Sequence, residues 1–217
     1  MSTVPSSRRT VGAATKPIDI ARSEMYLQGV SSTLRRLPFS LIDRVTEALW
    51  GAYLEDRSVY IFGNGGSAAL ASHCACDLGK GTVVNGQKRF RVLALTDNVP
   101  LLTAWANDTR YEDVFAEQLR SFLHKNDVAF AISGSGNSQN ILNALEVARE
   151  VGALTIGLTG FQGGKMKPLC DFCMVIPSEN MQVIEDIHLS VTHSIFTGLR
   201  ERIGDLSQFQ SVAVAAK

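Results

Sequence analysis

Two stretches of this sequence follow one plan: Val59-Tyr-Ile-Phe-Gly-Asn-Gly-Gly-Ser-Ala-Ala69 and Val128-Ala-Phe-Ala-Ile-Ser-Gly-Ser-Gly-Asn-Ser-Gln139. Each begins with an apolar run that carries no charge, which is typical of a strand buried on both faces of a parallel sheet. Each then passes through glycine, serine and asparagine into a segment with a helical pattern. Glycines let the backbone turn sharply, and the free amides at the start of a helix bind anions. The two turns therefore predict a site for a phosphorylated small molecule.

The rest of the chain alternates strand patterns with helical patterns. Such alternation predicts a parallel sheet covered by helices on both faces, with the ligand at the carboxyl ends of the strands. We expect an α/β fold, a three-layer α/β/α sandwich with a five-stranded parallel sheet and N-terminal helices. The expected strands are 57–63, 89–96, 127–133, 154–159 and 172–176, and the expected helices are 18–37, 38–54, 67–78, 98–107, 111–123, 138–151 and 183–203.

Four regions follow from this pattern. Residues 1–17 are small, polar and basic, and we expect a flexible tail. Residues 18–54 form amphipathic helices with more apolar surface than one subunit needs, which predicts a role in oligomerisation. Residues 55–205 make up the ligand-binding domain, and 206–217 are expected to be a C-terminal tail.

Composition excludes several classes of protein. Among the 217 residues, 21 lysines and arginines balance 21 aspartates and glutamates, which argues against a nucleic-acid partner and a membrane surface. No apolar run approaches the roughly 20 residues of a membrane span, and the start lacks the apolar core of a secretion signal. These features predict a cytoplasmic protein whose four cysteines are reduced thiols.

The glycine-rich turns also exclude two familiar nucleotide motifs. The first turn is not Gly-x-Gly-x-x-Gly, because Ala68 stands where the third glycine would be. Neither turn is followed by the Gly-Lys-Ser/Thr of a nucleoside-triphosphate loop. The pattern therefore argues against a nicotinamide enzyme and against an ATPase.

Four segments resemble the sugar isomerase (SIS) domain family, in particular its sedoheptulose-7-phosphate isomerase (phosphoheptose isomerase) branch: 62–73, 132–138, 158–160 and 184–193. The resemblance implies that 55–205 are an SIS domain. It also implies a homotetramer that converts sedoheptulose 7-phosphate to D-glycero-D-manno-heptose 7-phosphate. The same branch includes a non-catalytic protein that binds the bacterial replication initiator. The alternative is therefore a silent SIS module that binds a sugar phosphate or a protein partner.

The resemblance also implies which residues bind substrate. The serines and amides of the second turn would hold the phosphate, and the first turn would contact the sugar chain. The expected substrate-binding residues are Asn64, Gly65, Gly66, Ser67, Asn107, Asp108, Ser133, Gly134, Ser135, Ser138 and Glu185.

A ketose–aldose isomerase needs a base that moves a proton between C1 and C2, and a group that stabilises the enediolate. His73 and Asp77 lie four residues apart, on one face of a helix. The resemblance places a His and a Glu there, and a Gln and a His at the positions of Glu185 and His193, so two of the four residues differ from the family pattern. His188 precedes His193 by five residues, about 140° around a helix, so we expect the two to point to different places.

Two imidazoles and two carboxylates suit Zn²⁺ or another divalent metal. We therefore expect His73, Asp77, Glu185 and His193 as metal ligands, with the ion as a Lewis acid. In the alternative, Asp77 and His193 are catalytic as a metal-free base and acid.

Overall fold

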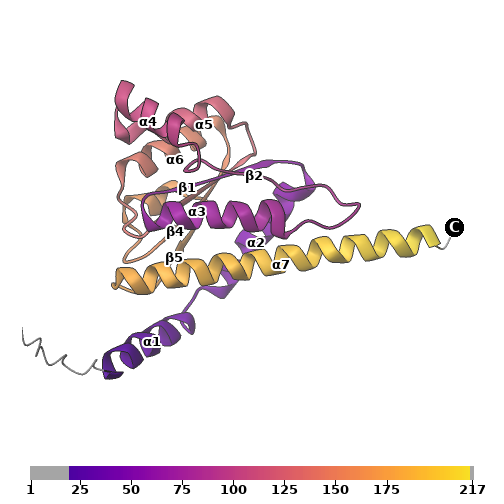
Figure 1. The fold of residues 1–217 in the computed structure, drawn as a ribbon, viewed down its shortest axis with the longest axis horizontal. Coiled ribbons are helices and arrows are strands. Elements are labelled where there is room, and N and C mark those ends of the chain that lie inside the picture. Colours follow the sequence, from indigo (N-terminus) through magenta and orange to yellow (C-terminus); the bar gives the residue numbers. More distant parts are fainter. Residues whose placement is uncertain (1–19, 216–217) are drawn as a thin grey trace, which may run out of the picture.

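Five parallel strands form the central sheet of the computed structural model, which describes residues 20–215 (Figure 1). Their order is β2-β1-β3-β4-β5, which confirms the predicted α/β sandwich with a five-stranded parallel sheet. In the pairing of β1 with β3, Gly63 lies opposite Ile132, so the two glycine-rich turns leave the same edge of the sheet from neighbouring strands. The strands are β1 (Ser58–Gly63), β2 (Arg91–Ala94), β3 (Val128–Ser133), β4 (Leu154–Thr159) and β5 (Phe172–Val175).

The sheet carries apolar side chains on both faces, so a layer of helices packs on each face. In β1, Val59 and Ile61 face one core, whereas Tyr60 and Phe62 face the other. The first core is covered by α2 (Phe39–Leu54), α3 (Gly66–Cys76) and α7 (Met181–Ala215), and the second by α4 (Val99–Asp108), α5 (Ala116–Phe122) and α6 (Gln139–Val151).

The first helix, α1 (Ile20–Leu34), lies beside α7 (Figure 1), and its residues Tyr26, Val30 and Leu34 pack against the first core. The hydroxyl of Tyr26 donates to the carboxylate of Asp186 over 2.6 Å and links the two helices. None of the helices in the described part of the chain is long and apolar enough to cross a membrane.

The structure corrects several predicted boundaries. The last helix does not end at 203 but continues as α7 to Ala215, through most of the segment expected to be a C-terminal tail. Gly204 does not stop it, since a single glycine costs a helix only about 1 kcal/mol. The predicted helix 111–123 is a 3₁₀ turn, η2 (Tyr111–Asp113), followed by α5. The expected tail 1–17 lies outside the described residues.

Two irregular segments had no counterpart in the sequence prediction. A π-helical turn, η1 (Asp77–Gly81), follows α3 directly. A 3₁₀ helix, η3 (Gly164–Leu169), follows β4 and packs on the second glycine-rich turn, because the amide of Met166 donates to the carbonyl of Gly136 over 2.9 Å.

Candidate active site

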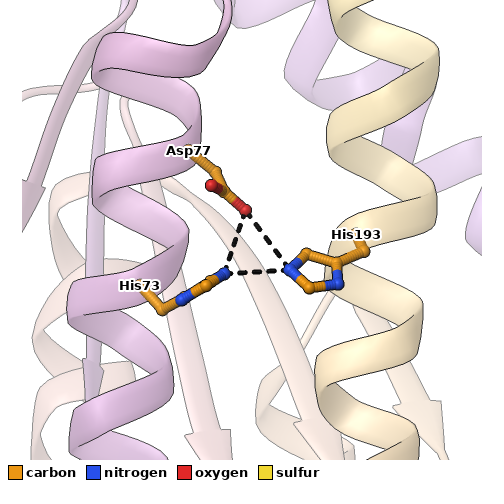
Figure 2. Close-up of side chains that lie close together, drawn as sticks. All are labelled: His73, Asp77 and His193. Atoms are coloured by element: carbon orange, nitrogen blue, oxygen red, sulfur yellow. Dashed lines mark hydrogen bonds and ion pairs between the residues drawn. The ribbon is translucent and has the colours of Figure 1, made fainter.

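The side chains of His73, Asp77 and His193 converge between α3 and α7 (Figure 2). His73 Nε2 lies 2.9 Å from His193 Nε2. Asp77 Oδ2 lies 3.3 Å from His73 Nε2 and 3.6 Å from His193 Nε2. The two histidine side chains are 48% and 47% exposed, so a substrate can reach the cluster from solvent.

The π-helical turn η1 begins at Asp77, the carboxylate residue of this cluster. Asp77 is its first residue, and Gly81 is its last. A Cβ atom on Gly81 would lie 2.7 Å from the ring of Phe196, so only glycine lets the turn lie this close to α7. Such turns are frequent at functional sites. Asp77 itself keeps α-helical dihedral angles, and its amide donates to the carbonyl of His73, so α3 places its carboxylate one turn after His73.

The donor set suits a divalent metal. The three donor atoms lie about 1.9 Å from the centre of the triangle that they form, close to the ~2.0–2.2 Å at which zinc binds nitrogen and oxygen. Three protein ligands with the fourth position open are typical of catalytic zinc sites. The geometry of His73, Asp77 and His193 thus fits an ion of this kind.

Glu185 does not belong to the cluster of three. It precedes His193 by eight residues, or about 12 Å of helix. Its carboxylate instead lies at the start of α3, where an added Cβ on Gly66 would be 3.0 Å from Oε1. Glu185 and His73 line the same cavity of about 270 Å³ between α3 and α7, so Glu185 lies beside the candidate metal ligands and not among them.

The first glycine-rich turn is tied to α6 by a reciprocal amide pair. Asn64 Nδ2 donates to Asn140 Oδ1 over 2.9 Å, and Asn140 Nδ2 donates to Asn64 Oδ1 over 2.8 Å. The hydroxyl of Tyr111 also donates to Asn64 Oδ1, over 3.0 Å. The amide of Asn64 is therefore engaged within the protein, whereas Gly66 and Ser67 line the cavity. Gly65 precedes α3 with a φ of 56°.

The second turn contains serines in two different situations. The hydroxyl of Ser133 is buried and accepts from the amide of Gly136 over 3.2 Å, so it stabilises the turn itself. Ser138 stands at the N-cap of α6 but makes no side-chain capping bond. Ser135 is half-buried and accepts from the amide of Asn137 over 3.3 Å, a long bond. Ser135 and Ser138 are the two hydroxyls of this turn that can face a ligand.

Asn107 and Asp108 lie at the end of α4 and are exposed. The amide of Asn107 donates to Asp108 Oδ1 over 2.8 Å. Within residues 20–215, neither lines the cavity between α3 and α7 or belongs to the histidine cluster.

Two buried residues lie near the site, and the sequence prediction missed the first of them. Asn140 is 3% exposed and pairs with Asn64 from a position 76 residues away, a contact that no local pattern reveals. His188 is 1% exposed and lines the same cavity as His73, while His193 faces the cluster. The two histidines of α7 thus point to different places, as their spacing predicted. Burial lowers the pKa of His188 to about 4, so its ring is neutral near neutral pH.

Comparisons with known proteins show which family the chain resembles. A family model described as SIS domain matches residues 25–160. A phosphoheptose isomerase of Aliarcobacter butzleri is 44% identical over 64% of this chain and 73% of its own length. One from Helicobacter pylori is 38% identical over 78% of this chain and 84% of its own length. The solved structure of a phosphoheptose isomerase from Neisseria gonorrhoeae has a TM-score of 0.77 at 26% identity and covers 84% of this chain and 98% of its own.

Proposed function

This chain belongs to the SIS domain family, and we propose that it is a phosphoheptose isomerase that interconverts sedoheptulose 7-phosphate and D-glycero-D-manno-heptose 7-phosphate. The observation that carries the proposal is the convergence of His73, Asp77 and His193 between α3 and α7 (Figure 2). A carboxylate beside two imidazoles supplies the base and the proton donors that aldose–ketose interconversion needs.

The residues take the following roles. Asp77 removes the proton from C1 of the ketose and returns it to C2, because it is the carboxylate within 3.6 Å of both histidines. If no metal is bound, His193 donates a hydrogen bond to the oxygen that becomes negatively charged in the enediolate. His73 orients the carboxylate of Asp77 from one turn earlier on α3.

Zinc, or a similar divalent ion, is the cofactor that the donor set favours. His73, Asp77 and His193 would hold it, with Glu185 at the neighbouring wall of the cavity. When bound, the ion supplies a Lewis acid for the oxygens on C1 and C2.

Incubation with sedoheptulose 7-phosphate, with and without added Zn²⁺, tests the proposed function. We expect NMR to detect the aldose heptose 7-phosphate as product. A folded protein that binds the ketose but forms no product would instead support a silent SIS module.

Phosphate binding by the second turn gives a sharper prediction. Replacing Ser135 with alanine should weaken the binding of sedoheptulose 7-phosphate about ten- to a hundred-fold, because a hydrogen bond to a charged group contributes about 1.5–3 kcal/mol. Titration calorimetry with the sugar phosphate measures the change, and inorganic phosphate should lose affinity in parallel.

The matched control is Ser121→Ala on α5, which removes an exposed hydroxyl that donates to the carbonyl of Glu117 in its own helix. This variant should bind like the wild type. Unchanged affinity in Ser135→Ala, combined with a loss of stability, would mean that the turn is structural and that the phosphate binds elsewhere.

We also propose that the protein is a homotetramer. Met25 and Leu27 on α1 are 69% and 64% exposed, on a helix whose inner face packs against α7 and the first core (Figure 1). Light scattering should give four times the 23.5 kDa of one chain. A stable monomer that retains activity would contradict the proposal that this surface joins subunits.

A further inference from the structure

Two of the four free cysteines lie together at one edge of the sheet. Cys173 lies on β5, the last strand in the order of the sheet, and Cys170 comes just before this strand. Gly157 lies opposite Cys173 on β4 and leaves the space that the two sulfurs share. An added Cβ on Gly157 would lie 2.7 Å from Cys170 Sγ and 3.3 Å from Cys173 Sγ. Both sulfurs are therefore within 3.3 Å of one point.

The surroundings of the two thiols make Cys173 the better nucleophile. A hydrogen bond from the thiol of Cys170, helped by the positive charge of Lys167, lowers the pKa of Cys173 despite its burial. The same hydrogen bond, together with burial and the charge of Asp171, raises the pKa of Cys170, and the charge of Arg149 offsets this only in part. Because the thiolate is the reactive form of cysteine, Cys173 should react first and Cys170 second.

The pair is accessible to small molecules and separate from the candidate active site. Both cysteines are half-buried, and within residues 20–215 no strand pairs with the outer edge of β5. Cys170 packs against the second core, on the face of the sheet that α6 covers. The cluster of His73, Asp77 and His193 lies between α3 and α7, on the other face. A reaction at the two cysteines therefore does not depend on the proposed function.

We propose that Cys170 and Cys173 form a redox-active dithiol that a low-molecular-weight disulfide converts reversibly to an intramolecular disulfide. The Cys173 thiolate attacks one sulfur of the reagent and releases a thiolate, which leaves Cys173 in a mixed disulfide. Cys170 gives its proton to the released thiolate and attacks Cys173 Sγ, and the second thiolate leaves. Two protein thiols and one small disulfide thus give one protein disulfide and two small thiols, the second of which takes up the proton that Cys173 had released.

Oxidised glutathione is the probe that tests this proposal on the folded, full-length protein. After proteolysis, mass spectrometry should show that the peptide with Cys170 and Cys173 has lost two hydrogens and carries no glutathione. Dithiothreitol should restore both thiols. Cys76 is the internal control, because it is exposed on α3, and it should hold the glutathione that it acquires.

Two variants assign the roles of the two thiols. In Cys170→Ser, one glutathione should remain on Cys173, because there is no second thiol to expel it. In Cys173→Ser, Cys170 should remain a free thiol. Glutathione on Cys170 in Cys173→Ser, with none on Cys173 in Cys170→Ser, would overturn the assignment of Cys173 as the nucleophile.

Other results would overturn the dithiol itself. One is a wild-type peptide that stays unmodified while Cys76 carries glutathione, since the pair would then be closed to the reagent. Another is a wild-type peptide that holds glutathione as stably as Cys76, since the two sulfurs would then not meet. A third is a disulfide that forms only after urea has unfolded the chain. None of these results bears on the proposed isomerase, which is tested separately with sedoheptulose 7-phosphate.

Discussion

Replacing His193 with alanine should remove the bound metal and lower kcat/KM about 10²–10⁴-fold. The substitution deletes one of three donor atoms that lie within 3.6 Å of one another, and His73 and Asp77 alone leave only two ligands. In the metal-free alternative, the same imidazole is the proposed donor to the enediolate oxygen, so the variant should lose activity in either case. Elemental analysis of purified protein and a kinetic assay with sedoheptulose 7-phosphate measure the two effects.

His124→Ala is the matched control, because this histidine is exposed in the loop before β3 and lies outside the cluster. It should keep close to one metal equivalent per chain and wild-type activity. Cys170→Ser should also keep the metal. Metal content that survived in both His73→Ala and His193→Ala would rule out the proposed site.

Replacing Gly136 with alanine should destabilise the protein by about 2–4 kcal/mol and reduce sugar-phosphate affinity more than a hundred-fold. Gly136 has a φ of 65°, and an added Cβ would lie 2.3 Å from the carbonyl oxygen of Gly163. The turn would have to move away from η3, to which the carbonyl of Gly136 is bonded through the amide of Met166. The amides and hydroxyls that we expect to bind phosphate would move with it.

The control variant Gly86→Ala measures the cost of a positive φ alone, without the steric clash that an added Cβ meets at Gly136. Gly86 has a φ of 80°, but an added Cβ would meet no atom within 4 Å. This variant should lose about 1–2 kcal/mol and bind sugar phosphate normally. Urea unfolding and calorimetry on both variants measure the difference, and equal effects in the two would show that the packing of the second turn against η3 is unimportant.

Sequence patterns predict the sheet well because its strands are continuous apolar runs that glycines end abruptly. The run from Val128 to Ser133 is buried throughout, and its predicted and observed limits differ by one residue. The π turn after α3 could not be predicted in this way. Its close approach to α7 requires Gly81 beside the ring of Phe196, a residue more than a hundred positions later in the chain. Contacts of this kind leave no periodic signal.

Some residues of the candidate site could likewise be predicted from the sequence, and others could not. The spacing of His73 and Asp77 on one helix predicts their shared face, and the family resemblance adds His193 from α7. The resemblance also grouped Glu185 with these ligands, but Glu185 lies beside Gly66, outside the group of three. The amide pair of Asn64 and Asn140 joins the first turn to α6, and only the folded chain reveals it.

The most direct test of the proposed chemistry is NMR of sedoheptulose 7-phosphate with the zinc-loaded protein in D₂O. If Asp77 moves a proton between C1 and C2 beside His73 and His193, the aldose product should appear, and deuterium should enter at C1 of the ketose or C2 of the aldose. Asp77→Asn should abolish both signals while sugar-phosphate binding is retained. A wild-type protein that binds the ketose but leaves its C1 hydrogens and its structure unchanged would contradict the account.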